Sequence, residues 1–502
     1  MIHVKMIHVK GRLGVGGRSE PVSKLPTGIV GFDHIALGGL PVRRTTLVAG
    51  STGSGKTLFG LEFLMKGILQ FDEPGVFVTF EESPSDLRQI MASFGYDIDG
   101  TEAAGKWMFI DAALKSSPPD AVIGNYDFGG LIARIDQAVR SIGAKRIALD
   151  STGSLLSRFS EAAHVRFELY RLSAALKDMG TTSILTMESS EEDGAITRFG
   201  VEEFVVDNVV VLRNVLEHSN RRRSVEILKF RGAPHRSGEW LFTIVAHEGF
   251  IVIPVSLLGP RQQASDVRVT TGNPELDRMC GGGFYRDSVI IVSGPTGVGK
   301  TLTATQFVDA GVARGERCLL FSFEESRDQL IRNAASWGFD LQLMERSGNL
   351  QIICDYPEMA SLEDHFIIMK QAIEKARPDR LAVDNLSALE RVASPRGLRD
   401  FIIGMTLFVK QQDITSLFTS TTRTLVGGST ITEAHISTIA DSIVVLRYVE
   451  LLGEIRRAIS FLKMRGSAHD TRIREFVIDG EGMHVGRPFE ESVRVLGWKP
   501  EE

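Results

Sequence analysis

The chain has 502 residues, of which 43% are hydrophobic and 24% are charged, and its formal net charge is −6. This length allows roughly two to four globular domains, and the acidic balance argues against a protein whose main task is to coat nucleic acid. No apolar run approaches the roughly 18 residues of a membrane-spanning helix, and three cysteines without metal-ligand spacing indicate a cytoplasmic protein without disulfide bonds.

The N-terminus carries the same five residues, Met-Ile-His-Val-Lys, at positions 1–5 and 6–10. It lacks the apolar stretch of a signal peptide, and we interpret the repeat as a cloning or start-site artefact. We expect a tail over residues 1–25 and a first domain over residues 26–255.

A phosphate-binding loop follows the first predicted strand. Residues 50–57 read Gly-Ser-Thr-Gly-Ser-Gly-Lys-Thr, between an apolar run at 46–49 and a helical pattern at 58–69, and they fit the P-loop motif. The backbone N–H groups of such a loop close around phosphates, while Lys56 adds a positive charge and Thr57 binds Mg²⁺. We expect the helix to bury one face, made of Leu61, Leu64, Met65 and Ile68. The expected ATP contacts are Thr52, Gly53, Ser54, Gly55, Lys56, Thr57 and Leu58.

Acidic residues follow the next predicted strands. The strand 76–80 leads into Glu81 and Glu82, and the strand 146–149 leads into Asp150. We predict that Asp150 holds Mg²⁺ through water, with a helix cap as the alternative. Adjacent strand side chains point to opposite faces, so we expect one glutamate to meet the γ-phosphate as a general base. The two carboxylates should also raise each other's pKa, and solvated charge at a strand end is the alternative explanation.

Basic residues late in this half have a separate role. The triplet at 221–223 is of the kind that is usually solvated surface. Lys229 and Arg231 are more informative because they lie in an apolar run. Cations there either reach the γ-phosphate of a neighbouring subunit, as an arginine finger does, or form a structural salt bridge, and the residues alone do not choose between the two.

The second half repeats these features in the same order, which indicates an internal duplication. A second P-loop, Gly-Pro-Thr-Gly-Val-Gly-Lys-Thr, spans residues 294–301. We expect a linker over 256–267, a second domain over 268–488 and a short tail over 489–502. The matched site residues are Thr296, Gly297, Val298, Gly299, Lys300, Thr301, Leu302, Glu324, Glu325, Asp384, Lys463 and Arg465.

Short apolar runs alternate with longer helical patterns in both halves. This alternation predicts an α/β protein with two tandem P-loop NTPase domains, each a mostly parallel sheet flanked by helices. Such sheets bind ligands beyond the carboxyl ends of their strands, where the motifs described above lie.

Together these motifs resemble the KaiC family, the RecA-like circadian clock ATPases with tandem domains. The resemblance covers residues 28–488, and its most specific passages are the runs 431–442 and 463–470. It implies that Ser437 and Thr438 are phosphorylated, with Thr432 as a third nearby hydroxyl. ATP and Mg²⁺ are the implied cofactors.

The resemblance also implies roles for the two nucleotide sites. The N-terminal domain would be a slow ATPase with Glu81 as base. The C-terminal domain would transfer the γ-phosphate to the adjacent subunit and later reverse the reaction, with Glu324 as base and Mg²⁺ ligand and Trp337 near the adenine. The residues implied to complete the N-terminal site are Ser93, Lys229, Phe230, Arg231 and His235. Those implied for the C-terminal site, several of them across the subunit interface, are Arg457, Lys463, Met464, Arg465, Ser467 and His469.

The implied assembly is a homo-hexamer of two stacked rings that acts as a timing or signalling switch, with a KaiB-like or other signalling partner on the N-terminal ring. The chain ends soon after Phe489, where the clock protein continues into the tail gripped by its activator KaiA, so we do not expect KaiA to bind. Ala233 and Ala468 stand where the clock protein has Thr and Trp. We expect no membrane and no nucleic acid as main partner.

Two other classes of function fit parts of the sequence. A RecA-type DNA-dependent ATPase or recombinase shares the P-loop and predicts ATP turnover stimulated by single-stranded DNA. The acidic chain has no aromatic–basic stripe, which speaks against that class. A nucleotide-gated scaffold with little chemistry would use the carboxylate pairs for structure alone.

Overall fold

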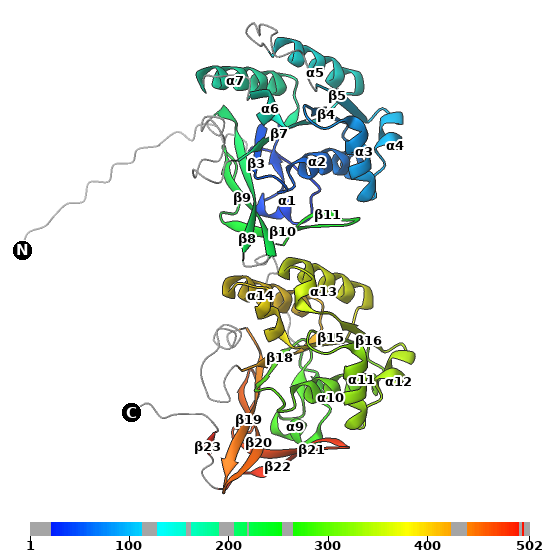
Figure 1. Ribbon diagram of the computed structural model, residues 1–502, viewed down its shortest axis with the longest axis vertical. Coiled ribbons are helices and arrows are strands. Elements are labelled where there is room, and N and C mark those ends of the chain that lie inside the picture. Colours follow the sequence, from blue (N-terminus) through cyan, green and yellow to red (C-terminus); the bar gives the residue numbers. More distant parts are fainter. Residues whose placement is uncertain are drawn as a thin grey trace, which may run out of the picture. The chain divides into compact units, whose positions relative to one another are not determined.

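The computed structural model describes residues 22–112, 128–156, 162–189, 205–217, 220–253, 265–422, 439–490 and 494–495. The chain divides into two compact units (Figure 1). Unit 1 comprises Met1–Leu212, Val225–Glu239 and Ala246–Ile251, and unit 2 comprises Arg213–Ser224, Trp240–Val245 and Val252–Glu502. Two short segments of the first half therefore group with unit 2, and each unit contains one P-loop.

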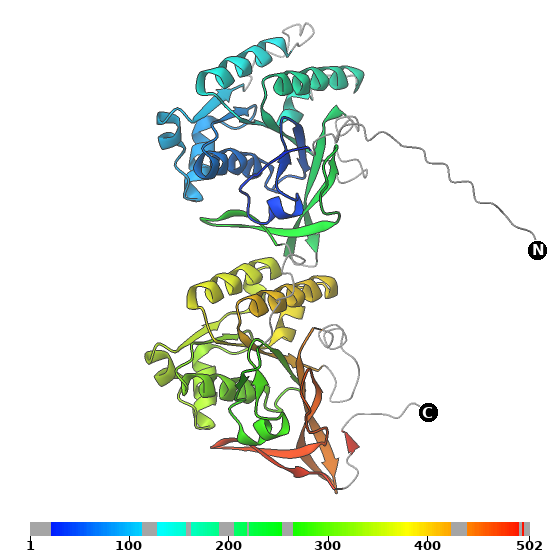
Figure 2. The same cartoon turned by 180° about the vertical axis from the view of Figure 1, so that it is seen from behind.

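The first half of the chain, most of which belongs to unit 1, forms a nine-stranded sheet of order β11-β10-β9-β8-β3-β7-β6-β4-β5. The strands from β5 to β8 run parallel, which confirms the predicted α/β class with a mostly parallel sheet. Helices flank the sheet in both views (Figure 1 and Figure 2). The strands are β3 (Thr45–Gly50), β4 (Gly75–Thr79), β5 (Trp107–Asp111), β6 (Arg146–Asp150), β7 (Thr182–Glu188), β8 (Asn208–Glu217), β9 (Asn220–Phe230), β10 (Glu239–Val245) and β11 (Gly249–Val252). The helices are α1 (Phe32–Ile35), α2 (Lys56–Phe71), α3 (Pro84–Ser93), α4 (Ile98–Ala103), α5 (Gly129–Ile142), α6 (Thr152–Leu156) and α7 (Ala162–Asp178), and β1 (Lys24–Leu25) pairs with β2 (Leu40–Pro41).

The parallel strands of unit 1 bury side chains on both faces, as their near-continuous apolar runs predict. Leu149 of β6 belongs to the hydrophobic cluster that also contains Leu169 and Leu172 of α7. Its neighbour Ala148 faces α2 instead, because a Cβ on Gly60 of that helix would lie 3.4 Å from the Ala148 Cβ. Helix α2 therefore covers one face of the sheet, and α7 covers the other.

Helix α2 buries the predicted apolar face, since the exposed fractions of Leu61, Leu64 and Met65 are 1% or less. It also buries polar side chains outside that predicted face. Glu62 and Lys66 form an ion pair of 2.9 Å with side-chain exposures of 0% and 7%. The helix is thus enclosed on more sides than a surface helix, with the ion pair neutralising its buried polar side.

Strand β4 ends one residue earlier than predicted, at Thr79. Phe80 donates its N–H to Asp150 O at 2.8 Å, and the Thr79 hydroxyl donates to Glu82 O at 2.5 Å, which turns the chain. The prediction that Glu81 and Glu82 end a strand is therefore wrong. They lie in a bend between β4 and α3, where strand alternation does not set their directions.

Unit 2 repeats this architecture around a larger sheet of order β16-β15-β17-β18-β14-β19-β20-β21-β22, with β23 beside β19. The strands from β16 to β19 run parallel, and those from β19 to β22 run antiparallel. The strands are β14 (Val289–Gly294), β15 (Cys318–Ser322), β16 (Leu350–Cys354), β17 (Arg380–Asp384), β18 (Thr415–Thr421), β19 (Ser442–Leu451), β20 (Glu454–Met464), β21 (Arg474–Asp479), β22 (Gly482–Pro488) and β23 (Arg494–Val495). The helices are α9 (Pro274–Met279), α10 (Lys300–Val312), α11 (Arg327–Ser336), α12 (Leu341–Arg346), η3 (Pro357–Met359), α13 (Leu362–Ala376), η4 (Leu386–Arg391) and α14 (Pro395–Gln411), and β12 (Arg268–Val269) pairs with β13 (Phe284–Tyr285).

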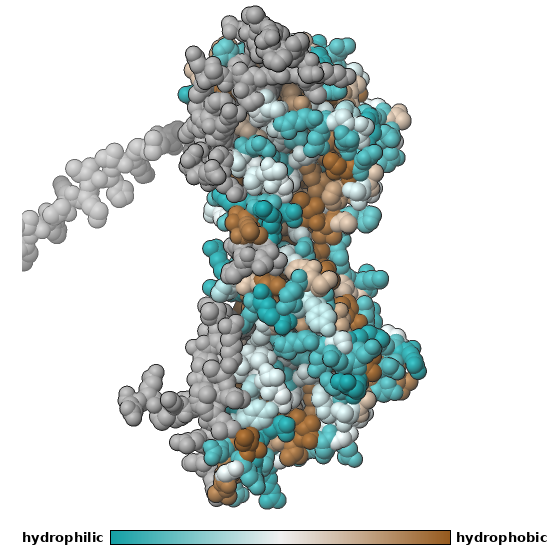
Figure 3. All heavy atoms as spheres, viewed as in Figure 1, coloured by the Kyte–Doolittle hydropathy of each residue, from teal (hydrophilic) through white to brown (hydrophobic). Residues whose placement is uncertain are grey.

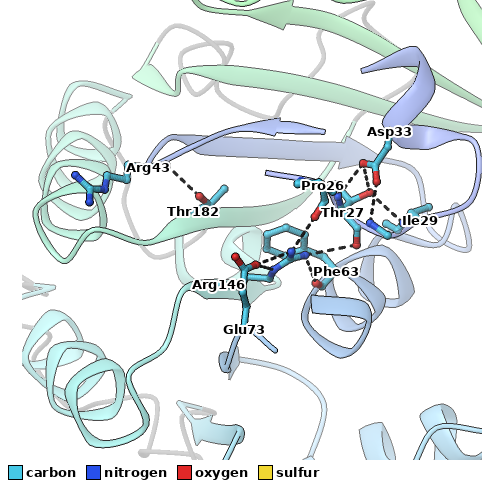
Figure 4. A network of polar contacts seen from close by, with 10 residues as sticks. Pro26, Thr27, Ile29, Asp33, Arg43, Phe63, Glu73, Arg146 and Thr182 are labelled. Carbon is cyan, nitrogen blue, oxygen red and sulfur yellow. Dashed lines mark hydrogen bonds and ion pairs between the residues drawn. The ribbon is translucent and has the colours of Figure 1, made fainter. Parts of the chain in front are cut away.

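A fully buried arginine ties three segments of unit 1 together (Figure 4). Arg146 begins β6 and donates to Phe63 O of α2 at 3.0 Å and to Pro26 O at 2.8 Å. Glu73 neutralises it at 2.6 Å, and the ring of Phe63 lies 4.8 Å from the guanidinium carbon. This contact fixes the P-loop helix against the strand that ends at Asp150.

Unit 2 contains the same arrangement at the start of β17. Arg380 donates to Phe307 O at 3.0 Å and to Thr270 O at 2.8 Å, and Glu316 neutralises it. A glycine makes room for each arginine, because a Cβ on Gly67 would lie 2.5 Å from the Arg146 side chain and one on Gly311 2.7 Å from that of Arg380. Both units therefore hold their P-loop helix in the same way.

The face of the molecule in Figure 3 is largely hydrophilic, with hydrophobic areas scattered over both units. One of them lies near the turn between β19 and β20, where Leu452 and Ile455 are 86% and 70% exposed. Leu462 of β20 and Val477 of β21 are also more than half exposed. Among the described residues, no helix combines the length and apolar character needed to cross a membrane.

Candidate functional site

The first P-loop connects β3 to α2. Gly53 and Gly55 have φ values of 74° and 92°, a conformation that favours glycine and turns the loop tightly enough to aim its N–H groups inward. The buried Lys56 ammonium donates to Gly50 O at 2.8 Å and to Ser51 O at 2.9 Å. The ammonium therefore lies inside the ring of loop atoms that would surround a phosphate.

The second P-loop connects β14 to α10 with the same geometry. Gly297 and Gly299 have φ values of 78° and 118°, and Lys300 donates to Pro295 O at 2.9 Å. Burial lowers the pKa of both lysines, against the raising effect of nearby carboxylates. The printed hydrogen bonds of each ammonium go to loop carbonyls, and a bound phosphate would add an anionic acceptor.

The P-loop of unit 1 and the residue after β6 also offer unsatisfied hydroxyl groups. Among the described residues, the buried Oγ atoms of Ser51, Ser54 and Ser151 have no hydrogen-bond partner. Buried polar atoms without partners are rare and costly, and they are satisfied when a ligand supplies acceptors. The residues present therefore fit a polyphosphate.

An aspartate meets the P-loop threonine in each unit. Asp150 accepts from Thr57 Oγ1 at 2.9 Å, and Asp384 accepts from Thr301 Oγ1 at 2.7 Å. The other carboxylate oxygens accept from Thr186 and Thr419, respectively. Burial raises the pKa of Asp150, while the threonine hydroxyls and Lys56 oppose that rise. These oxygen ligands suit a magnesium ion.

The helix-cap alternative for these aspartates finds no support in unit 2. Asn385 caps the helix that follows β17, accepting from Ala388 N at 2.9 Å. Asp384, one residue earlier, is turned toward Thr301 instead.

The two members of each glutamate pair differ in burial. Glu81 and Glu324 are exposed, whereas Glu82 and Glu325 are half-buried. Burial raises the pKa of Glu81, and the charges of Asp150 and Glu188 raise it further. The pKa of Glu82 is also raised, first by burial, then by Asp150 and only then by Glu81. The expected mutual effect within the pair is therefore secondary to burial and to the aspartate.

The hydrogen bonding of the half-buried glutamate differs between the two units. Asn333 donates to Glu325 Oε2 at 3.2 Å, whereas Glu82 Oε2 is buried and has no hydrogen-bond partner among the described residues. Unit 1 has an extra carboxylate nearby, because Glu188 ends β7 beside Gly50 and accepts from Thr52 Oγ1 at 3.2 Å. In unit 2 the position beside Gly294 is Thr421. The sequence analysis missed Glu188, although it ends a buried strand as Asp150 does.

The cations that occur late in each half lie at the end of each sheet that is remote from its own P-loop. They are Lys229, Arg231, Lys463 and Arg465. Strand β14 runs into the loop, and Ile291 in β14 is paired with Ile443, which is paired with Lys463. The Lys463 ammonium donates to Ala440 O at 2.8 Å, farther from the loop still. Arg465 N donates to Asp441 O at 2.8 Å, at the level where β14 begins. The length of β14, roughly 17 Å at about 3.3 Å per residue, thus separates Arg465 from the loop of its own chain.

Unit 1 places its cations in the same way. Lys229 donates to Val206 O at 2.9 Å and Arg231 N to Asp207 O at 3.1 Å, just before β8, whose first residue is paired with Thr46. The salt-bridge alternative is partly realised in unit 2, where Arg465 lies 3.8 Å from Asp441. Phe230, Met464, Ser467, His235 and His469 lie in the same segments, at or directly after the ends of β9 and β20.

Arg457 lies at the other end of β20. It is paired with Tyr448, whose hydroxyl donates to Thr296 O of the P-loop at 3.5 Å. The structure therefore separates Arg457 from Lys463 and Arg465, which the resemblance grouped with it. Arg223 precedes Lys229 by the same interval as Arg457 precedes Lys463, so it holds the equivalent position in the first half of the chain. The sequence analysis had assigned it to solvated surface.

An aromatic residue ends the helix after each glutamate pair. Trp337 is the C-cap of α11, and Phe94 is the C-cap of α3 with nearly the same backbone angles. Both are half-buried, and Ser93 precedes Phe94 as an exposed residue. The sequence analysis singled out Trp337 and Ser93 but not Phe94, which is the counterpart of the tryptophan.

The proposed acceptors Ser437, Thr438 and Thr432 lie outside the described residues. The described chain resumes at Ile439, three residues before β19 begins. This strand is paired with β14, whose last residue opens the second P-loop.

The chain matches the family model described as "ATPase: KaiC" twice, over residues 25–256 and 269–490. It is 56% identical to the "Circadian clock protein KaiC3" of a Synechocystis strain, over 96% of this chain and 95% of that one. It is 50% identical to the "Circadian clock oscillator protein KaiC" of Prochlorococcus marinus, over 97% of both chains. It is 48% identical to the protein of that name in Synechococcus elongatus, over 96% of this chain and 92% of that one. These findings do not favour the DNA-dependent alternative.

Proposed function

The chain belongs to the KaiC family of ATPases, and we propose that it hydrolyses ATP in unit 1 and reversibly transfers phosphate to its own hydroxyl groups in unit 2. It would act in this way as a timing or signalling switch. The observation that carries the proposal is the duplicated set of P-loop lysine, threonine, aspartate and glutamate pair around one sheet edge in each unit.

Unit 1 is the better arranged for hydrolysis. Glu81 is the exposed member of its pair, and its raised pKa suits a base that accepts a proton from water. Glu188 adds an acceptor beside the P-loop where unit 2 has only Thr421, which favours an ordered water molecule over a protein hydroxyl. Attack by that water breaks the bond between the β–γ bridging oxygen and the γ-phosphorus, and ADP and phosphate leave.

Unit 2 has the same P-loop lysine, aspartate and glutamate pair, but it has Thr421 where unit 1 has Glu188. A serine or threonine hydroxyl would take the place of water, with Glu324 accepting its proton as the new phosphate ester forms and ADP leaves. The proposed acceptors are Ser437 and Thr438, with Thr432 nearby. Each added phosphate would bring roughly two negative charges to that segment, which is enough to change an interface.

Magnesium would be held by Thr57 with Asp150 in unit 1 and by Thr301 with Asp384 in unit 2, with Glu324 as a further ligand. An ion held there would supply positive charge to neutralise the phosphates.

The remote cations support an assembly in which ATP lies between subunits. In their own chain, Lys229, Arg231, Lys463 and Arg465 lie at the sheet end opposite the P-loop. A neighbouring subunit that packs its P-loop against that end would receive them, as in a ring. Exposed apolar residues in the turn before β20 and on β20 and β21 give such an interface buried surface: Leu452, Ile455, Leu462 and Val477. We propose a homo-hexamer of this kind, with a KaiB-like or signalling protein as partner of the N-terminal ring.

The proposal is tested by incubating the protein with γ-labelled ATP and Mg²⁺, with and without single-stranded DNA. We expect label on the protein, a second band in a phosphate-retaining gel and turnover that DNA does not change. An unlabelled protein with a single band would overturn the phosphotransfer part, and DNA-stimulated turnover would favour the recombinase class.

A further inference from the structure

The loop after β20 has two backbone anchors and a side-chain clamp between them. We call residues 465–470 the post-β20 loop. It begins where Arg465 N donates to Asp441 O at 2.8 Å and ends where Asp470 N donates to Met279 O at 2.8 Å. Arg465 and His469, which the proposed function directs at a neighbouring nucleotide, lie at or between these anchors.

Arg268 of β12 contacts the middle of this loop. Its guanidinium donates to Ser467 Oγ at 2.6 Å and to two carbonyls of the glycine-rich turn before β13, Cys280 O at 2.8 Å and Gly283 O at 2.6 Å. Arginine supplies several donors in one rigid plane, which allows a single side chain to hold two backbone segments at fixed spacing.

Tyr285 completes the clamp. It is the cross-strand partner of Arg268, and its ring centroid lies 4.1 Å from the guanidinium carbon. Its hydroxyl donates to Gly466 O at 3.2 Å. A cation stacked on an aromatic ring loses side-chain freedom, so Arg268 is held in the orientation that reaches the loop.

Unit 1 contains a corresponding clamp made of different residues. Lys24 lies in β1 at the position of Arg268 and donates to Ala36 O and to Pro234 O, the latter at 2.5 Å. Its ammonium lies 5.6 Å from the ring centroid of Phe230. The loop end is anchored as in unit 2, because Arg236 N donates to Ile35 O at 2.8 Å.

The two clamps share their position and their contacts but not their residues. Each uses a cation from the first hairpin of the unit and one aromatic ring. Each joins the glycine-rich turn after that hairpin's first strand to the loop that follows β9 or β20. A requirement for the position of this loop explains why the arrangement is present twice, whereas core packing alone would not demand a cation at a half-exposed site.

We propose that Arg268 and Tyr285 are positioning residues that hold the post-β20 loop ready to contact a nucleotide bound by the neighbouring subunit, and that Lys24 does the same in unit 1. This inference rests on the proposed function, because the loop's ligand is the neighbour's ATP. The clamp touches no nucleotide itself. It lowers the cost of ordering the loop, so its loss weakens ATP binding while the P-loop of the same subunit stays intact.

The test measures affinity for a non-hydrolysable ATP analogue by displacement of a fluorescent nucleotide, with the assembled full-length protein. Two classes of site are expected, one for each unit. Arg268→Gln should weaken one class by about tenfold, the scale of a lost charge-assisted hydrogen bond, and Lys24→Gln should weaken the other. Arg268→Lys keeps the charge but not the planar set of donors, so it should lose less affinity than Arg268→Gln.

Thermal unfolding and Lys463→Gln serve as controls. If Arg268→Gln lowers only the unfolding temperature and leaves both affinities unchanged, the clamp is merely structural and the inference fails. If both Arg268→Gln and Lys463→Gln leave affinity unchanged, the proposed contact of these residues with a neighbouring nucleotide is contradicted as well. If Lys463→Gln weakens binding but Arg268→Gln does not, only the positioning role is contradicted.

Discussion

Thr301 donates its hydroxyl hydrogen to the carboxylate of Asp384 across 2.7 Å, although 83 residues separate them in the chain. The two meet because parallel strands end at one edge of the sheet, and the P-loop helix begins at that same edge. Thr57 and Asp150 repeat the contact at 2.9 Å. This pair marks where a magnesium ion would bind in each unit.

Replacing Thr301 should therefore change the requirement for magnesium. We expect Thr301→Val to raise the Mg²⁺ concentration for half-maximal phosphotransfer by at least about tenfold, the scale known for weaker, outer-shell partners of metal sites. Thr301→Ser keeps the hydroxyl and should stay close to the wild type. A magnesium titration at saturating ATP measures both, and equal curves for Val and Ser would exclude the threonine as a ligand.

The pH dependence of ATP turnover should depend on Ser154. Burial and Asp150 raise the pKa of Glu81, and a hydrogen bond from Ser154 lowers it. A base must be ionised, so turnover in unit 1 is lost as the pH falls through this raised pKa. Ser154→Ala removes the opposing hydrogen bond and should move the acidic limb of the pH profile to higher pH, with the plateau unchanged. Lys300→Ala as background confines turnover to unit 1, and an unmoved limb would rule out Glu81 as the base.

The buried pair in α2 predicts a stability effect with a natural control. Lys66→Ala leaves the Glu62 carboxylate buried without its cation and should destabilise the helix by about 3–5 kcal/mol. The double variant Glu62→Gln with Lys66→Ala reproduces the residues of unit 2, Gln306 and Ala310, and should recover most of that loss. Hydrogen exchange of the α2 amides measures both.

The Glu62–Lys66 pair also determines how the stability lost in Lys66→Ala should vary with pH. Burial raises the pKa of Glu62 above its unfolded value, so the stability that comes from protonating it is present at low pH and is lost as the pH rises through the folded pKa. Lys66 opposes this rise, and its removal makes the loss larger. The Lys66→Ala defect should therefore grow with pH, and a defect that shrinks with pH would contradict the assignment.

Mixing two inactive variants tests whether the remote cations act between subunits. Lys300→Ala lacks a working P-loop in unit 2, and Lys463→Gln with Arg465→Gln lacks the cations. In a mixed ring, about one quarter of the interfaces combine an intact loop with intact cations, because each component is intact in half of the subunits. We expect phosphotransfer to recover toward that fraction on mixing. Phosphotransfer that stays at zero would indicate that the P-loop and the cations of one site belong to the same subunit, which contradicts action between subunits.

The sheet edge and its loops were predictable because their signals are local. The glycines of the P-loops require positive φ, and the apolar strands that lead into Asp150 and Asp384 bury both faces. The side chain of Glu62 was not predictable, because its burial depends on β11, whose Phe250 N–H it accepts at 3.2 Å. Helical periodicity reports one face of a helix and not what covers the other.

The composition of the site depended on contacts between distant segments. Glu188 shows no motif, and only the strand pairing beside Gly50 brings it to the site. The resemblance groups Arg457 with Lys463, which lies six residues later. In an extended strand, six residues span roughly 20 Å, so the two reach opposite ends of the sheet.

The most direct test of the two-unit account is intact and site-mapped mass spectrometry after incubation with Mg-ATP. We predict one or two added phosphates, mapped to Ser437 and Thr438, in the wild type and in Glu81→Gln, and none in Lys300→Ala. An unmodified wild-type chain, or phosphate that persists on these residues in Lys300→Ala, would contradict the assignment of phosphotransfer to unit 2.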